Sequence, residues 1–415
     1  MSCITNIRSV AKYESKILVR SWFFRIFTLL AVVFLGFFNF AMMLMEDNFG
    51  LWFAKSVSSN IPYLNLLLLN TGQAVVAVFL SSEFLKRDKK LDTSEVFYVR
   101  PLSNAEYVIG KIWGNLRVFL LLNLLVLAIV LAFNFMASGI TVDWQAYGVY
   151  FLLISLPTLI FIIGLSIFLM LVLRNQALTF ILLLGYIGLT LFYIQDKFYY
   201  LFDYMVYNLP LFKSTIVGFS SLELILNHRA IYFFAGLGFI FFTIFLFKRL
   251  PNARRSHYPW LFLSLCMFLL AGTAGYRHVR SILREGEIRA LYTSINNKYV
   301  HEPKIAIDWY DISVEQKPET ICSVVGMKGT ALATSEIFTF CLNPGLKVGE
   351  VKEGEKPLDF KREEQILAVD FGRKIEKGDT ISLSICYEGR IKDDFCYLDI
   401  PEEVLQQPYD KEMLK

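Results

Sequence analysis

The chain has 415 residues, of which 55% are hydrophobic and 16% aromatic, and it carries a formal net charge of +4. Ordinary soluble globular domains contain fewer apolar residues, so this composition excludes that class. The small net charge points to no particular charged partner and gives no reason to expect nucleic acid.

Seven long apolar runs occupy the chain as far as Gly275. Each reaches or approaches the roughly 20 residues that a helix needs to cross the hydrocarbon core of a bilayer. The first run is too long for a cleavable signal peptide and no small-residue cleavage site follows it, so we expect a permanent anchor. The sequence therefore predicts a polytopic α-helical membrane protein, with runs over residues 22–45, 61–84, 113–137, 146–173, 177–194, 230–247 and 258–275.

The distribution of positive charge predicts the orientation of these runs. Sixteen Lys and Arg residues lie in the N-terminal segment and in the loops after the second, fourth and sixth runs. The intervening loops hold only Lys55, Lys197 and Lys213, with Arg229 at the edge of the sixth run. Because short cytoplasmic loops carry the excess of positive charge, we expect a cytoplasmic N-terminus and residues 276–415 outside. Four arginines follow the seventh run, but long translocated segments largely escape this rule.

Residues 7–21 predict a short amphipathic helix at the cytoplasmic membrane surface. Val10, Tyr13 and Ile17 share one helical face, whereas the charged side chains lie elsewhere. The alternative is a basic juxtamembrane stretch without a helix.

The loop after the second run carries helix-capping signals. Asp92 and Thr93 can cap a short helix over residues 94–99. Pro101 ends that helix, because the residue before a proline avoids the helical conformation.

A second helix should begin directly after this break. Ser103 and Glu106 have the spacing of a capping box, in which each residue bonds the backbone of the other. The helix is expected to run through Lys111 into the third span. The whole loop is then a rigid helix–break–helix projecting into the cytoplasm.

Residues 195–228 lie between the fifth and sixth runs and are too polar to cross a membrane. They contain a dense group of aromatic residues over 199–207. Such density is typical of an interfacial or re-entrant element at the level of the lipid headgroups. Interfacial anchoring is the expected use, and gating is the alternative.

The character of the chain changes after Gly275. Residues 304–309, 337–342, 365–371 and 380–387 alternate or are rich in β-branched and aromatic residues, and turn signals lie at 343–345 and 377–379. These patterns predict an antiparallel β domain. Its cysteines, Cys322, Cys341, Cys386 and Cys396, either form disulfides of undetermined pairing or remain free thiols.

The motifs of common enzymes are missing from the sequence. It contains no Gly-x-x-x-x-Gly-Lys-Ser/Thr, so no ATP can bind through a phosphate loop and ATP-driven work requires a partner. His301-Glu302 begins like a zinc motif, but Ile305 stands where the second histidine would be, and Pro303 would break the helix. We therefore expect no catalytic residues, no metal and no bound cofactor.

Polar residues within the runs are few. Buried Asp, Glu, Lys and Arg are not expected in mid-span, which argues against a carrier coupled to protons or sodium. Gly185 and Gly188 are expected to permit close helix packing in the fifth span. The candidate pathway-lining residues are Asn65, Asn70, Gln73 and Asn123, for which the alternative is hydrogen bonding between helices.

Together with the amphipathic helix and the six-span layout, the stretch from Glu83 to Lys111 resembles the permease subunits of type-2 ATP-binding-cassette exporters. In that family the corresponding loop holds the coupling helix that docks on the ATPase. The resemblance implies a coupling role for Glu83, Asp92, Thr93, Ser94, Glu95, Arg100, Pro101, Ser103, Glu106 and Lys111.

The resemblance also implies an order of domains. A cytoplasmic elbow helix would cover residues 1–21, and a six-span permease domain would cover 22–247, with its coupling loop at 85–111 and its external segment at 195–228. A loop and seventh span (248–275) and an extracytoplasmic linker with a β-sandwich-like domain (276–415) would follow. ATP and Mg²⁺ would sit on cytoplasmic ATPase subunits, and a second permease copy or paralogue would complete a dimer among the lipids of a bacterial inner membrane.

The tail carries a second resemblance. Residues 340–348, 358–369 and 377–389 are similar to the N-terminal β domain of the aminopeptidase N family, but the His-Glu-x-x-His motif of that family is missing. Catalysis is therefore not implied. Alternatives to the permease are a membrane-anchored extracytoplasmic binding or peptidase-like protein and a structural membrane scaffold.

Overall fold

The computed structural model describes residues 3–44, 58–82, 102–136, 141–194, 197–207, 222–247, 258–317 and 320–392, with 209, 211, 213–214, 218–219, 395 and 398. The chain divides into two compact units. The described residues up to Lys213 and from Leu222 to Arg280 form the helical unit. Those from Ser281 onward form the β unit, with which Ser214 and the pair 218–219 also group.

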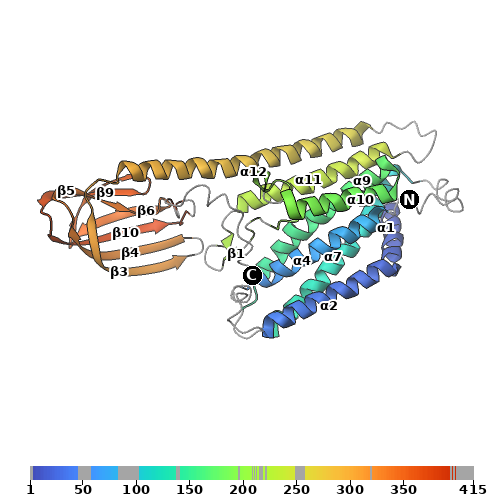
Figure 1. The fold of residues 1–415 in the computed structure, drawn as a ribbon, viewed down its shortest axis with the longest axis horizontal. Helices are drawn as coiled ribbons and strands as arrows, with labels where there is room; N and C mark the ends of the chain where they lie inside the picture. Colours follow the sequence, from blue (N-terminus) through green and yellow to red (C-terminus); the bar gives the residue numbers. More distant parts are fainter. Residues whose placement is uncertain are drawn as a thin grey trace. The chain divides into compact units, whose positions relative to one another are not determined.

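The helical unit is a bundle in which α4, α7, α9 and α11 run side by side (Figure 1). Its elements are α1 (Cys3–Arg20), α2 (Trp22–Leu44), α4 (Asn60–Ser82), α7 (Asn104–Met136), α8 (Trp144–Tyr150), η2 (Phe151–Ser155), α9 (Leu156–Leu173), α10 (Gln176–Leu189), η3 (Thr190–Ile194), η4 (Phe198–Tyr200), β1 (Lys213–Ser214), α11 (Leu222–Leu246) and α12 (Tyr258–Lys298). Two of these elements cross the boundary, because Ser214 of β1 and the part of α12 from Ser281 onward group with the β unit, as does β2 (Gly218–Phe219).

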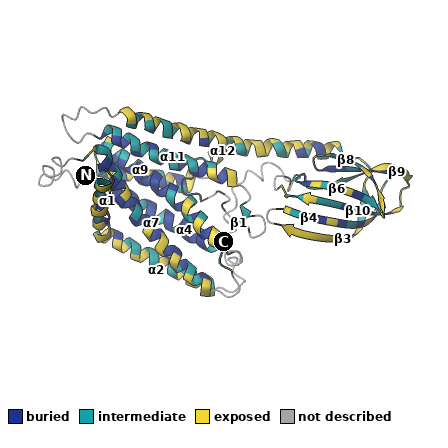
Figure 2. Ribbon diagram, turned by 180° about the vertical axis from the view of Figure 1, so that it is seen from behind, coloured by how far each residue is buried: buried dark blue, intermediate teal, exposed yellow. Residues whose placement is uncertain are grey.

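Seven helices of the described chain are long and apolar enough to cross a membrane. Their presence confirms the predicted polytopic architecture and indicates a multi-pass membrane protein. α4 and α9 are mostly buried among other helices, whereas α2 and α10 expose most of their apolar side chains. Figure 2 shows this exposure for α2. In a membrane, exposed apolar faces of this kind contact lipid or another protein.

Two helix boundaries differ from the sequence prediction. α11 begins at Leu222 rather than at residue 230, because His228 and Arg229 are buried and hydrogen-bonded inside the unit. α12 continues past Gly275 to Lys298, through the segment expected to be a linker.

Glycines set the closest approach between α9 and α11. A Cβ on Gly164 would lie 2.7 Å from the carbonyl oxygen of Gly236, and one on Gly236 would lie 2.7 Å from the backbone nitrogen of Phe161. A Cβ on Gly185 or Gly188, which the sequence assigned to close packing, would meet nothing within 4 Å. The close contact is therefore made by a different pair of glycines, since backbones meet where two helices both lack side chains.

We expect Gly236→Ala to destabilise the helical unit by about 1–3 kcal/mol, because the added methyl group meets backbone atoms rather than a flexible side chain. Thermal unfolding of the detergent-purified full chain measures this effect. Gly185→Ala is the matched control and should be neutral or stabilising, because alanine is the better helix former and the added methyl group meets nothing. Equal unfolding temperatures for the two variants would show that the α9–α11 contact is looser than described.

The β unit consists of two antiparallel sheets. Their strands are β3 (Ile305–Lys317), β4 (Thr320–Ala331), β5 (Ser335–Cys341), β6 (Leu346–Glu353), β7 (Lys356–Pro357), β8 (Asp359–Glu363), β9 (Ile366–Ile375) and β10 (Thr380–Gly389). One sheet has the order β3-β4-β10-β6-β7 and the other β5-β9-β8. The predicted antiparallel β domain is thereby confirmed, although β4, β6, β7 and β8 were not predicted individually.

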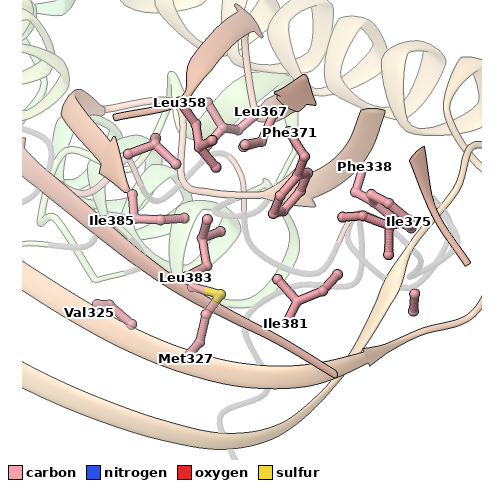
Figure 3. Packing of buried hydrophobic residues seen from close by; sticks show 13 residues of the cluster. Val325, Met327, Phe338, Leu358, Leu367, Phe371, Ile375, Ile381, Leu383 and Ile385 are labelled. Atoms are coloured by element: carbon pink, nitrogen blue, oxygen red, sulfur yellow. The ribbon is translucent and has the colours of Figure 1, made fainter. Parts of the chain in front are cut away.

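The core of the β unit lies between these sheets. Met327, Ile381 and Leu383 of the larger sheet pack in one cluster with Phe338 and Phe371 of the smaller (Figure 3). Alternation along the strands explains the arrangement, because every second side chain of β10 points inward.

The last part of α12 belongs to the β unit and contacts the β8–β9 hairpin. The buried side chain of Gln365 donates from Nε2 to the carbonyl oxygen of Tyr292 at 2.6 Å. At the surface, Lys298 Nζ lies 2.8 Å from Glu363 Oε2, and the Tyr299 hydroxyl donates to the same carboxylate. These donors, Lys298 first, hold the pKa of the Glu363 carboxyl below its usual range.

Candidate functional site

Helix α7 begins with the capping box that the sequence predicted. The backbone N–H of Ser103 donates to Glu106 Oε2 at 2.7 Å, and the N–H of Glu106 donates to Ser103 Oγ at 3.1 Å. The same carboxylate accepts from Asn6 Nδ2 of α1 at 3.2 Å. Glu106 therefore joins the start of α7 to α1 as well as capping its own helix.

The start of α7 is also joined to the end of α11. Asn104 Nδ2 donates to the carbonyl oxygen of Phe247 at 2.6 Å. The rings of Tyr107 and Phe247 stack with their centroids 5.5 Å apart. A helix C-terminus leaves carbonyl groups without intrahelical partners, and here a side chain of α7 bonds one of them.

α1 lies directly on α7 along two glycines. A Cβ on Gly110 would stand 2.7 Å from Val10 Cβ, and one on Gly114 would stand 2.9 Å from the carbonyl oxygen of Ala11. Ser15 Oγ donates to the carbonyl oxygen of Gly114 at 2.7 Å. Gly110 and Gly114 are four residues apart, which is the spacing that lets two helix backbones approach closely.

An ion pair lies inside this contact. Lys111 Nζ is 3.7 Å from Glu14 Oε2, and both side chains are about 95% buried, with 4% and 5% exposure. The ammonium group also lies 5.0 Å from the centre of the Tyr107 ring. Arg117 adds a further link, donating from Nε to Ser15 Oγ. We call this set of contacts among α1, α7 and the end of α11 the α7 junction.

The α7 junction corrects the face predicted for the N-terminal helix. The sequence assigned Val10, Tyr13 and Ile17 to one apolar face, but the structure buries Ala11, Glu14, Ser15 and Leu18 and leaves Tyr13 exposed. Gly110 of α7 lies against Val10, and Gly114 lies against Ala11 and Glu14, so the buried face is set by the contact with α7. The helix itself is present and begins at Cys3.

Of the residues assigned to coupling, the structure describes three. Ser103, Glu106 and Lys111 come together in the α7 junction. Sequence reasoning missed their partners on α1, although the Gly110-x-x-x-Gly114 spacing was a usable signal. The remaining residues lie outside the described part of the chain: Glu83, Asp92, Thr93, Ser94, Glu95, Arg100 and Pro101.

A closed ring of hydrogen bonds lies at the centre of the bundle. Asn70 Nδ2 donates to Ser155 Oγ at 3.1 Å, and Ser155 Oγ donates to Asn123 Oδ1 at 2.7 Å. Asn123 Nδ2 donates to Gln73 Oε1 at 2.8 Å, and Gln73 Nε2 donates to Asn70 Oδ1 at 2.6 Å. All four side chains are buried, so the polar ring joins α4, α7 and η2 inside an apolar bundle.

Three of the four candidate lining residues are therefore in one ring. The fourth, Asn65, forms a separate amide pair with Asn39 of α2, at 2.7 Å and 3.0 Å. These contacts are the hydrogen bonds between helices that the sequence left as the alternative. A pathway-lining role stays a prediction.

Arg229 is buried where α9 departs from regular helix. Pro157 has no N–H to offer the carbonyl of Leu153, and residues Phe151–Ser155 form a π-helical turn. Arg229 Nε donates to the Leu153 carbonyl oxygen at 2.6 Å, and Nη2 donates to Thr158 Oγ1 at 2.8 Å. The guanidinium thus donates to a backbone carbonyl that Pro157, beside the π-helical turn, leaves without its regular helical N–H donor.

This position contradicts the expectation that ionisable side chains are not buried within a span. The sequence placed Arg229 at an edge, whereas it lies within α11 with 2% exposure. Its donors are engaged by protein acceptors, so it forms part of the packing of the helical unit. The expectation failed because its bonding partners are distant in the sequence.

The described residues of 197–211 are held inside the helical unit by their main-chain carbonyls. Arg229 Nη1 donates to the Tyr204 carbonyl oxygen at 3.0 Å, and the Tyr232 hydroxyl donates to that of Leu201 at 2.6 Å. His228 Nε2 lies 3.0 Å from the Tyr200 oxygen, and His278 Nε2 lies 2.9 Å from the Tyr199 oxygen.

The side chains of the second half of this segment are buried, whereas Phe198, Tyr199 and Phe202 in the first half are exposed. Tyr204, Met205, Val206, Leu209 and Leu211 are almost fully enclosed. The buried half, with its side-chain-bonded carbonyls, fits a re-entrant element, and the exposed aromatic residues of the first half fit interfacial anchoring, so the two expected uses both stay predictions. We call the described residues of 197–211 the inserted segment.

Metal and thiol chemistry find little support. Within the described ranges there is no group of three or more His, Cys, Asp or Glu side chains that could hold a metal ion. Cys322, Cys341 and Cys386 are free thiols, and Cys396 lies outside the described residues. Partial desolvation raises the pKa of the Cys341 thiol, although the residue is exposed.

Breaking the buried ion pair of the α7 junction should destabilise the chain. Lys111→Met removes the ammonium group that lies beside the buried Glu14 carboxylate, at a cost of about 3 kcal/mol, and Glu14→Gln/Lys111→Met should recover much of the loss. Thermal unfolding of the full chain in detergent measures both. Lys12→Met, on the exposed face of α1, is the control. A double variant as unstable as Lys111→Met would show that the pair itself does not matter.

No family model matches the chain, and no curated protein matches it. Among solved structures it is similar to an M1 zinc metallopeptidase from Deinococcus radiodurans, at 18% identity and a TM-score of 0.20, over 21% of each chain. A mutant of the Deinococcus radiodurans enzyme bound to a Tyr-Ser-Ala substrate matches at 17% identity and a TM-score of 0.19, again over 21% of each chain. This chain thus spans only 21% of the length of those structures, and nothing about activity follows from the match.

Proposed function

We propose that the chain is the permease subunit of an ATP-binding-cassette exporter in a bacterial inner membrane. It would pair with a second permease copy or a paralogue and with separate cytoplasmic ATPase subunits that bind ATP and Mg²⁺. Seven apolar helices, the resemblance of residues 83–111 to a coupling loop and the lack of a phosphate-loop motif support this proposal.

The α7 junction is the observation that carries the proposal. The loop over residues 83–101 ends where α7 begins, and there α7 is bonded to α1 through Glu106 and Lys111 and to α11 through Asn104. A force applied to the loop would therefore reach three helices at once. An ATPase that pushes a permease needs such a rigid connection, since a flexible joint would absorb the motion.

The interior of the bundle offers a route for that motion. α7 carries Asn123, and the polar ring joins it to α4 and to η2. η2 in turn meets Arg229, which is bonded to the inserted segment through Tyr204. A tilt of α7 would strain these contacts in series, and we propose that release of the inserted segment opens the exit path.

The β unit supports a second candidate function. It is a compact pair of sheets with its own apolar core, so it is suited to bind a ligand outside the membrane, with the helices as an anchor. Recovery of an ATPase with the chain favours the permease. Retention of a ligand by the chain with no ATPase recovered favours the binding protein.

The coupling role of the loop is tested by Glu95→Arg. Glu95 lies in the short helix expected over residues 94–99, and reversing its charge should weaken docking on the ATPase by a kcal/mol or more, roughly, if the contact excludes water. The measurement is the amount of ATPase that co-purifies with the chain from the native membrane, and its turnover.

The control is Glu336→Arg, an identical charge reversal at an exposed position of the β unit. We expect Glu95→Arg to remain in the membrane at normal abundance with little ATPase attached, and Glu336→Arg to retain its full amount. A Glu95→Arg chain that keeps and stimulates its ATPase normally would refute the coupling assignment.

A further inference from the structure

Strand β3 is an edge of the larger sheet and bonds to β4 on one side. Its residues are exposed along nearly the whole strand, as Figure 2 shows. Four large side chains contribute most of this surface: Trp309 is 50% exposed, and Tyr310, Ile312 and Val314 are each 55% exposed. Contiguous apolar surface of this kind on a folded domain marks a contact with another molecule.

Three of these side chains lie on the core side of the sheet. In the register with β4, Tyr310, Ile312 and Val314 stand opposite Met327, Val325 and Ser323. Those three β4 residues are buried, so the inner face is covered at β4 and open at β3. The larger sheet has five strands and the smaller has three, so the smaller sheet does not extend over the inner face of β3.

Three other strands lie at the described edges of the two sheets. β5, with seven residues, is bonded on its outer side to the chain before β3, where the Thr339 N–H donates to the Pro303 carbonyl oxygen. β7 has two residues, one of which is Pro357, and β8 is a strand of five residues that includes Asp359, Lys361 and Glu363. Short length, proline and charge all discourage pairing with another strand. β3 has 13 residues and no proline, and its one bulge lies near its start, between Ile307 and Trp309.

We propose that β3 pairs antiparallel with β3 of a second copy of this chain, in the register that places Ile312 opposite itself. The β3 pairing rests on the proposed function in one respect, since an exporter of that class contains a second permease subunit. The pairing would join the two larger sheets across a two-fold axis. It would also cover the open inner face of each β3 with the apolar side chains of the other.

The sequence of β3 selects this register. Centred on Ile312, Tyr310 faces Val314 of the other copy, and Asp311 faces Ser313. Trp309 then faces Glu315, so directly opposed positions carry no like charges.

Neighbouring registers bring carboxylates together. A register centred on Asp311 opposes two copies of that residue, and one centred on Ser313 opposes Asp311 to Glu315. Like charges directly opposite one another on paired strands are destabilising. Registers centred on Tyr310 and on Val314 also avoid like charges. The first, however, places the bulge at Ile307–Trp309 close to its centre, and the second pairs only residues 311–317. The register centred on Ile312 is therefore favoured by charge, length and strand regularity together.

Disulfide cross-linking in native membranes tests this pairing. Ile312→Cys is introduced into the full chain, with the six native cysteines replaced by serine or alanine. Opposed residues of paired strands have Cα atoms close enough for a disulfide, so mild oxidation should yield a covalent dimer. The yield should be severalfold above that of Lys361→Cys, a matched control on the exposed edge strand β8.

Co-expression of two different cysteine variants tests the register of the pairing. Chains carrying Asp311→Cys, co-expressed with chains carrying Ser313→Cys, should cross-link to each other more than either does to itself. Adding Ile312→Asp to both chains opposes two carboxylates and should reduce that cross-link severalfold. Because Asp311, Ile312 and Ser313 are exposed, none of these substitutions disturbs the core of the β unit. Equal cross-linking in all combinations would overturn the register and with it the pairing.

Two differently tagged copies are purified from the same membranes, with the ATPase measured alongside. If the copies and the ATPase co-purify but Ile312→Cys cross-links no better than Lys361→Cys, the β3 pairing is wrong and the permease proposal stands. If the cross-link forms and no ATPase is recovered, the β3 pairing holds and the permease proposal fails.

Discussion

The structure depends on one constraint: backbone polar groups away from water must find protein partners. Regular helices meet it internally, but Pro157 and the inserted segment do not. Arg229, His228, His278 and Tyr232 meet the need by bonding carbonyl groups, and their own burial fixes where α11 lies. These polar side chains are buried inside the bundle because the helix is interrupted near Pro157 and the inserted segment is not α-helical. Their hydrogen bonds hold the inserted segment in the bundle.

The same constraint bears on how the helices move together. Contacts made by hydrogen bonds and glycine backbones have fixed geometry, whereas apolar side chains can slide past one another. Gly110 and Gly114 bring α1 onto α7, and the polar ring through Asn123 holds α7 to α4. α7 is therefore held at its first turns and near its middle, which is what a helix needs to carry a displacement from one end of the bundle inward.

Local sequence signals predicted local structure well. The seven spans follow from apolar runs, and the Ser103–Glu106 capping box follows from spacing alone. Features set by distant partners were missed. α11 begins early because Arg229 donates to the carbonyl of Leu153, and α1 buries Ala11 and Ser15 because Gly114 of α7 lies against Ala11 and accepts a hydrogen bond from Ser15. The exposure of β3 depends on the unequal width of two sheets, which strand patterns do not reveal.

Energy coupling by this route requires the loop before α7 to lie in the cytoplasm, and the predicted topology places the β unit outside. Labelling with a membrane-impermeant thiol reagent tests this most directly, using chains without native cysteines that carry either Asp88→Cys or Glu355→Cys. We expect intact cells to label Glu355→Cys, in an exposed turn of the β unit, and to leave Asp88→Cys unlabelled until they are permeabilised. Labelling of Asp88→Cys from outside, with or without labelling of Glu355→Cys, would contradict an ATPase-coupled permease.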